Sequence, residues 1–260
     1  ACFQKGEHGN RINCLSCHSM HEGDIKGQIK PENRTDKACL SCHQQFAQPA
    51  QLAAHTGHKA DSAGNRCYDC HMPRVVYGVM AFHRTHDITV PDAGLTASQL
   101  VPNACNQCHL DKSVNWAIAE SKRLWPQRFA NAQPSSDEIF NQPEGIRALF
   151  AGDALTRAMA AEALGFQTGG GAMKLDANWA TPFLLEALSD NYPIVRFFAA
   201  NGLMATGQRL PKPDYLATET ARLSAVEQWW ARYPQARQQV FSLATGLRAR
   251  RINVDVEVGE

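Results

Sequence analysis

Apolar side chains recur with helical spacing in the C-terminal part of the chain. From residue 145 onward Leu, Ile, Ala and Phe return every three or four positions, the period of a helix that buries one face. The helices predicted by this pattern cover Gly145–Gly165, Trp179–Leu188, Ile194–Thr206, Thr220–Arg232 and Gln235–Arg251. Before the third of them, Pro193 suits the first helical turn and Asp190 suits the cap. A weaker repeat predicts one more helix over Asp111–Trp125.

Two segments break this helical pattern. Residues 126–144 contain three prolines and two adjacent serines, which is typical of a linker or an irregular loop. Residues 252–258 alternate strictly between apolar and polar side chains, so they are a strand candidate with no obvious partner in their own chain. We expect this tail to fray, or to pair with another subunit.

The N-terminal part, residues 1 to about 115, has a different composition. It is rich in Cys, His, Gly, Asn and Gln and poor in branched aliphatic side chains. Such a segment cannot bury enough apolar surface to fold alone, so another group must act as its core.

Charge argues against nucleic acid as a partner, and hydropathy argues against a membrane-spanning segment. The chain has 26 basic and 25 acidic residues and a formal charge of +1, without the basic excess that favours nucleic acid. No apolar run reaches the roughly 18 residues that span a bilayer, so no transmembrane segment is expected. Because the chain begins at Ala1-Cys2, we expect either a mature, processed product or a trimmed chain. A lipid anchor at Cys2 and a bond to another chain stay open alternatives.

Eight of the nine cysteines form four copies of one motif, Cys-x-x-Cys-His, the attachment signature of haem c. Two thiols one helical turn apart reach the two vinyl groups of a porphyrin, and the next His supplies one axial nitrogen to the iron. The thioether cysteines are Cys14 and Cys17, Cys39 and Cys42, Cys67 and Cys70, and Cys105 and Cys108. The proximal histidines are His18, His43, His71 and His109. The sequence therefore predicts four haem c groups.

Structural zinc and a redox-active disulfide also use paired cysteines. Zinc sites do not require a His after every second Cys, and a redox disulfide does not need four copies of the pair. Both alternatives are therefore weaker than haem.

The spare histidines decide whether the irons can bind a substrate. An iron with two protein ligands passes electrons, whereas an iron with one can also bind a small molecule. Six histidines lie outside the motif positions, all in the N-terminal part: His8, His21, His55, His58, His83 and His86. Six candidates suffice for bis-histidine ligation of four irons. Ligation by the nearby Met20, Met72 or Met80 is the less favoured alternative.

Residues 10–117 resemble multihaem c-type cytochromes fused to tetratricopeptide or HEAT-type repeats. The resemblance rests on the four motifs, on His55-Thr-Gly-His58 and on Arg84-Thr-His86-Asp with Val90-Pro91. It implies His21, His55, His58 and His86 as sixth ligands and leaves His8 and His83 as reserves. Residues 190–203 are similar to the second half of a HEAT repeat. An ordinary helical cap over the haems is the alternative to such a repeat domain.

The expected fold is mostly α. A loop-rich tetrahaem cytochrome c domain with little regular structure covers 1–125, a linker covers 126–144, and a helical HEAT-like repeat domain covers 145–260. The expected function is electron transfer, not enzyme catalysis; a reductase of a small nitrogen or sulfur oxyanion at one open haem is the alternative. Redox proteins are the expected partners, and a homo-oligomer or filament is a further expectation. Because haem c is attached outside the cytoplasm, the expected location is the periplasm or the cell surface.

Overall fold

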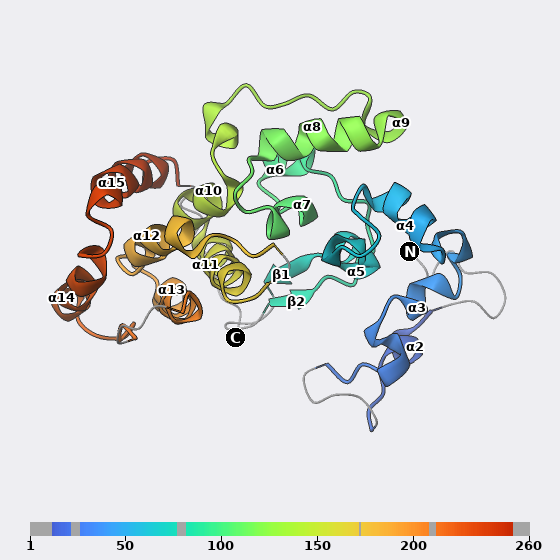
Figure 1. Ribbon diagram of the computed structural model, residues 1–260, viewed down its shortest axis with the longest axis horizontal. Coiled ribbons are helices and arrows are strands. Elements are labelled where there is room, and N and C mark those ends of the chain that lie inside the picture. The colour runs from blue at the N-terminus through green and yellow to red at the C-terminus, as the bar shows by residue number, and fades with distance from the viewer. Residues whose placement is uncertain (1–11, 22–26, 77–81, 172, 208–211, 252–260) are drawn as a thin grey trace. The chain divides into compact units, whose positions relative to one another are not determined.

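The structure is a computed structural model that describes residues 12–21, 27–76, 82–171, 173–207 and 212–251 (Figure 1). Helices dominate these residues, which confirms the mostly α fold class. The chain divides into two compact units. The first unit comprises residues 1–73 and 84–90, and the second comprises 74–83 and 91–260. This division differs from the expected domains at 1–125, 126–144 and 145–260, which stay a prediction.

The first unit is built from helical segments of one or two turns joined by loops. The α-helices are α2 (Cys14–Cys17), α3 (Lys37–Leu40), α4 (Pro49–Thr56) and α5 (Cys67–His71). Three 3-10 helices lie between them: η1 (Pro31–Arg34), η2 (Gln44–Phe46) and η3 (Ala63–Asn65). Helices this short are not stable in isolation, so tertiary contacts or a bound group must hold them.

Polar contacts hold the described part of the first unit together. Its only buried residues are Thr56 and Asn65, and it buries no hydrophobic side chain. The Thr56 hydroxyl donates to the Asn65 side chain, whose amide donates to the Lys59 carbonyl. Arg84 donates to the carbonyl oxygens of Tyr68 and Met72. Within the described residues, the protein itself thus supplies this unit with no apolar core.

The second unit contains a two-stranded sheet and the longer helices. Strand β1 (Arg74–Val76) pairs with β2 (Phe82–Arg84), whose last residue belongs to the first unit. The helices that follow are α6 (Gly94–Gln99), α7 (Ala104–Cys108), α8 (Val114–Leu124), α9 (Pro126–Phe129), η4 (Glu138–Asn141), α10 (Glu144–Ala151), α11 (Ala154–Thr168), α12 (Ala177–Ala187), α13 (Pro193–Ala205), α14 (Glu219–Trp230) and α15 (Pro234–Arg248). No described helix is long and apolar enough to cross a membrane.

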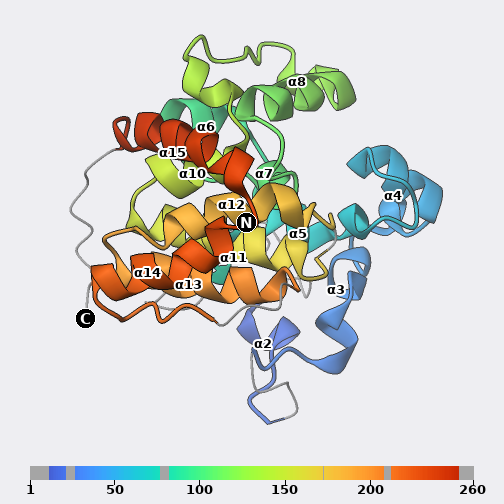
Figure 2. The same cartoon turned by 60° about the vertical axis from the view of Figure 1, so that its left-hand side comes forward.

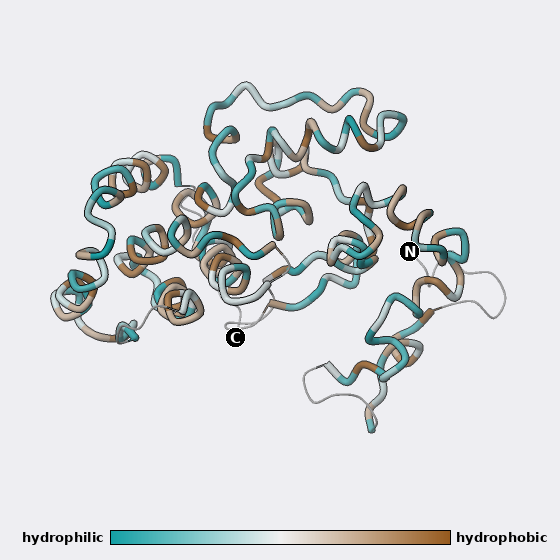
Figure 3. The backbone as a smooth tube through the Cα atoms, in the orientation of Figure 1, coloured by the Kyte–Doolittle hydropathy of each residue, from teal (hydrophilic) through white to brown (hydrophobic). Residues whose placement is uncertain are grey.

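The main core of the second unit lies among α10 to α15 (Figure 2). Leu149, Leu164, Leu184 and Leu203 are fully buried in it, and Trp229 of α14 is buried with them. Apolar and polar positions alternate along these helices, as the hydropathy colouring shows (Figure 3). The pattern explains the helices, because each buries one apolar stripe against its neighbours.

A smaller apolar cluster joins α6, α8 and η4. Ala93, Val114, Ala117, Ile118 and Phe140 form it, and Cys105 of α7 packs against it. Leu110, two residues beyond α7, packs instead into the main core. Helix α7 is thus tied to both apolar clusters of the second unit.

Most of the predicted helices are present. The spans predicted at 179–188, 194–206, 220–232 and 235–251 correspond to α12, α13, α14 and α15. The span predicted over Gly145–Gly165 is two helices, because the chain turns at Gly152 and Asp153 caps α11. The helix predicted over Asp111–Trp125 is α8, and Ser113 caps it. Part of the expected linker is also helical, as α9 and η4. The strand predicted at 252–258 lies outside the described residues.

The prediction that Asp190 caps the helix at Pro193 is wrong. The N-cap position belongs to Tyr192, while Pro193 occupies the first turn as predicted. The Asp190 carboxylate accepts hydrogen bonds from Arg157 and Arg251, at 2.8 and 2.9 Å for the closest pairs, and its Oδ1 also accepts from the Tyr192 N–H at 3.0 Å. Two guanidinium groups stabilise a buried carboxylate more than one helix terminus does.

Candidate haem sites

Each of the four motifs wraps into about one helical turn. Motif one lies on α2, motif three on α5 and motif four on α7, while motif two begins on α3. In motifs one, two and four the backbone N–H of the histidine donates to the carbonyl of the first cysteine, at 2.9 Å each. Residues three apart in such a turn share one face, so each thiol pair can reach one edge of a porphyrin.

Asparagine caps start two of these turns. The Asn13 side chain accepts from the Ser16 N–H at 3.1 Å, and Asn103 accepts from the Asn106 N–H at 2.9 Å. Asparagine is a preferred cap because its side-chain oxygen satisfies a free N–H of the first turn. In both motifs an asparagine one or two residues before the first cysteine thus fixes the turn that presents the thiols.

The thiols fit thioether bonds better than zinc or a disulfide. No disulfide joins the eight motif cysteines. In the described part of the chain, no three His, Cys, Asp or Glu side chains converge on a point that could hold a metal ion. Structural zinc needs four such ligands around one point, whereas haem c needs only two thiols at a porphyrin edge and axial nitrogens.

Two pairs of imidazoles lie at the spacing of axial ligands. The ring centroids of His18 and His86 are 6.0 Å apart, and those of His55 and His71 are 6.1 Å apart. With metal–nitrogen bonds of about 2 Å and about 1.1 Å more to each ring centroid, two imidazoles on one iron lie roughly 6 Å apart. Each pair joins one motif histidine to one spare histidine. The rings of His55 and His71 are almost parallel, at 9°.

Three histidines are oriented through their Nδ1 atoms. The Nδ1 of His18 lies 2.7 Å from the Gly27 carbonyl oxygen, and the Nδ1 of His71 lies 2.7 Å from that of Thr89. The Nδ1 of His58 lies 2.9 Å from the carbonyl oxygen of Thr56. An Nδ1–H that donates to a carbonyl fixes the tautomer and leaves the lone pair of Nε2 for a metal.

The surroundings of His55 favour a neutral imidazole. Its ring packs on Phe46 with centroids 4.3 Å apart. Burial, and then the charge of nearby His71, lower the pKa of His55 below its ordinary value of 6.5. An axial ligand must be neutral to offer its lone pair, so this environment suits a ligand.

Motifs two and three meet at their first cysteines. The thiols of Cys39 and Cys67 are hydrogen-bonded to each other. This bond lowers the pKa of Cys39 to about 7 and raises that of Cys67, whose thiol keeps its proton. In addition, the Cys67 N–H donates to the Asp36 carboxylate at 3.1 Å, across from the start of α3. The thiol pairs of motifs two and three therefore lie close to each other.

Motif four belongs to the second unit. Burial raises the pKa of the Cys105 thiol, which packs on the smaller apolar cluster. The His109 ring lies 4.9 Å from that of Trp116. The Asn106 amide donates to the carbonyl oxygens of His109 and Lys112, at 3.0 and 3.1 Å, and holds the chain just beyond the motif.

The remaining candidates are placed less closely. His21 is exposed, His43 follows α3, and His83 lies in the middle of β2. His8 lies outside the described residues. Sequence reasoning missed the roles of Asn103, Asn106 and Gln107, although amide side chains inside and just before a motif are a usable signal.

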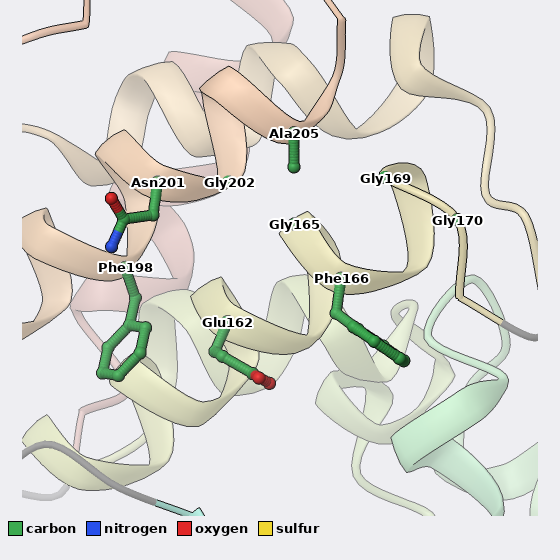
Figure 4. Close-up of a pocket in the computed structure, with 9 residues that line it drawn as sticks. All are labelled: Glu162, Gly165, Phe166, Gly169, Gly170, Phe198, Asn201, Gly202 and Ala205. Carbon is green, nitrogen blue, oxygen red and sulfur yellow. The ribbon is translucent and has the colours of Figure 1, made fainter.

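A separate hollow lies between α11 and α13. It has a volume of about 450 Å³, and Figure 4 shows Phe166, Phe198 and Glu162 around it. Glu162 is already paired with Arg74 at 3.2 Å. The rest of the lining is Asn201 and small residues, so the hollow lacks the acid–base pair or nucleophile of a catalytic site.

Comparison with known proteins supports the reading of the motifs. The family model of the doubled CXXCH motif matches residues 7–48, which include motifs one and two. Neither the curated proteins nor the solved structures gave a match. The match supports a multihaem c-type cytochrome with covalently bound haem c, and such proteins generally work outside the cytoplasm.

Proposed function

We propose that this chain is a tetrahaem electron carrier in which each iron is held between two imidazoles. The two histidine pairs at 6.0 and 6.1 Å carry the proposal, because each has the separation of ligands on opposite sides of one iron. Bound haem supplies a one-electron couple between ferric and ferrous iron. The residues of the chain attach it, orient its ligands and keep its coordination positions closed.

The geometry supports ligand assignments for three of the haems. His86 is the sixth ligand of the haem on His18, and His55 that of the haem on His71. For the haem on His43 we assign His58, because its Nδ1 is anchored in the same way as those of His18 and His71. His21 is the alternative for that position.

Close contacts between motifs support electron transfer from haem to haem. The Cys39 and Cys67 thiols are in contact, and the first cysteines of successive motifs are only 25, 28 and 38 residues apart. Porphyrins attached at such neighbouring points have little protein between them. Electrons can then pass along the row without a diffusing carrier.

The alternative function is reduction of a small nitrogen or sulfur oxyanion. It requires one iron without a sixth protein ligand, together with proton donors. The pairing of spare with motif histidines favours the carrier. We further propose redox proteins as partners, a periplasmic or cell-surface location, and a HEAT-like role for helices α10 to α15 in assembly with other copies or proteins.

Spectroscopy of the ferric holoprotein tests the proposal. A pyridine haemochrome assay should return four covalent haems per chain, and electron paramagnetic resonance should show low-spin iron throughout. The His86→Ala and His55→Ala variants should each convert one iron to high spin, while Met20→Leu, a change at an exposed residue beside motif one, should leave the spectrum unchanged. A high-spin iron in the unmodified protein, or fewer than four haems, contradicts the carrier.

A further inference from the structure

We propose that His83 is the sixth ligand of the fourth haem, the one attached to Cys105 and Cys108. The inference rests on the proposed bis-histidine carrier and names the ligand that completes it. Family resemblance left His83 as a reserve, so this assignment comes from the placement of β2 in the second unit.

The distribution of histidines between the two units limits the choice. Eight of the ten histidines lie in residues 1–73 or 84–90, the first unit. The second unit contains only two in its sequence, His109 of motif four and His83. A haem attached in the second unit therefore has one further histidine available within that unit.

Motif four itself holds the sheet that carries His83. Gln107 lies between the two motif cysteines in the sequence, and its side-chain Oε1 accepts from the Arg74 N–H at 2.9 Å. Its Nε2 donates to the Arg74 carbonyl at 2.7 Å. These two bonds reproduce the pairing of a neighbouring strand, so the amide fixes β1 against the attachment turn.

Strand pairing extends this link to His83. Strand β2 pairs with β1 (Figure 1). His83 is the middle residue of β2. Phe82 packs on Phe198 of α13, with ring centroids 4.9 Å apart. Since neighbouring side chains of a strand point to opposite faces, His83 faces away from α13 and is exposed on the other face of the ribbon.

The other nearby histidine has a partner already. His86 lies three residues after His83, and its ring centroid is 6.0 Å from that of His18 in the first unit. Two histidines in one short segment would then serve different haems. The chain between them, at Arg84, is also where it passes from one unit to the other.

Substitution in the holoprotein tests this assignment. His83→Ala should keep four covalent haems, convert one iron from low to high spin, and regain the low-spin signal when imidazole is added. Val75→Ala, a change on the paired strand, should leave all four irons low-spin. In a Cys105→Ser/Cys108→Ser background, which lacks the fourth haem, His83→Ala should produce no new high-spin iron.

Different outcomes separate this inference from the proposed function. Four low-spin irons in the His83→Ala protein overturn the ligand assignment alone. A new high-spin iron in the three-haem background also overturns it, because His83 then serves another haem. A high-spin iron in the unmodified protein overturns the carrier itself. If His83→Ala does not mature, His83→Met supports the inference by raising the reduction potential of one haem, and four unchanged potentials overturn it.

Discussion

At the scale of single residues, charge and hydrogen bonds decide where side chains lie. Asp190 is 2% exposed and is shared by Arg157 and Arg251, whose side chains are 5% and 17% exposed. Burial, the largest influence, lowers the pKa of Arg251, while the Asp190 charge raises it. The carboxylate thus compensates two cations that the fold has removed from water.

Asp190→Asn should lower the free energy of unfolding by about 3–5 kcal/mol, because it leaves Arg157 buried without a counter-charge. Urea unfolding followed by far-UV circular dichroism measures the loss. Asp137→Asn, which breaks an exposed pair with Arg250, is the matched control and should change the midpoint little. Equal midpoints for the two variants would contradict the buried role of Asp190.

The pKa of Asp137 should lie below its ordinary value of 3.8. The Ile139 N–H is the main cause and Arg250 the second. A lowered folded-state pKa means that the stabilisation is present above pH 3.8 and is lost as the pH falls through the folded pKa. In an NMR titration, Arg250→Gln should raise the pKa only part of the way, because the backbone bond remains. A full return to the ordinary value would assign the shift to Arg250 instead.

The ligands show what the sequence reveals at this scale. The repeated motif predicts the thioether cysteines and the proximal histidines, and the number of spare histidines predicts a second imidazole for every iron. The sequence does not predict that the rings of His18 and His86 lie 6.0 Å apart. These residues are 68 positions apart, and the path of the loops and short helices between them brings the two rings together. Separation along the sequence does not indicate which residues the fold brings into contact.

At the scale of elements, small residues set how closely helices pack. A Cβ atom added at Gly165 of α11 would lie 2.4 Å from the Cα of Gly202 in α13. Contacts that short do not occur, so the two backbones approach this closely only because Gly165 carries no Cβ atom. The close packing of α11 on α13 therefore depends on glycine at position 165.

Gly165→Ala should destabilise the protein by about 1–3 kcal/mol, because the added methyl group forces the two helices apart. Gly246→Ala is a matched control within α15: nothing lies within 4 Å of its added Cβ. It should stabilise the protein by about 0.5–1 kcal/mol through helix propensity. Thermal unfolding of both variants measures the contrast, and shifts of the same sign would contradict it.

Helices were predictable wherever apolar positions repeat, as in α12 to α15, since burial of one face also determines the helix. The ends of these helices were harder to predict than their presence. Asp190 has the side chain of a good cap, but Arg157, which is 33 positions earlier, binds its carboxylate. A local rule fails when a distant residue offers the stronger partner.

At the scale of the whole molecule, the two units differ in what stabilises them. The second has a continuous apolar core among α10 to α15. The described part of the first unit buries only Thr56 and Asn65. Sequence composition revealed this contrast, but not that motif four belongs with the helices, which depends on contacts of Cys105 and Leu110 with residues far along the chain.

Without haem the two units should behave differently. In a chain with all eight motif cysteines changed to serine, α10 to α15 should keep their protection against hydrogen exchange. The segment 27–73 should exchange rapidly, because the porphyrins provide its apolar core. Mass spectrometry of peptides from the two segments makes the comparison. Equal protection of 27–73 with and without haem would show that the protein folds this segment unaided.

The burial of Cys105 has a consequence for biogenesis. Cys105 is half-buried and packs against the small apolar cluster of α6, α8 and η4, whereas Cys14 and Cys42 are exposed. A lyase that joins thiols to vinyl groups needs access to the thiols, and closure of α6 and α8 around Cys105 removes that access. We therefore expect haem to be attached to motif four before α6 and α8 close around Cys105. The order of haem attachment would then follow from the tertiary structure rather than from the order of motifs along the chain.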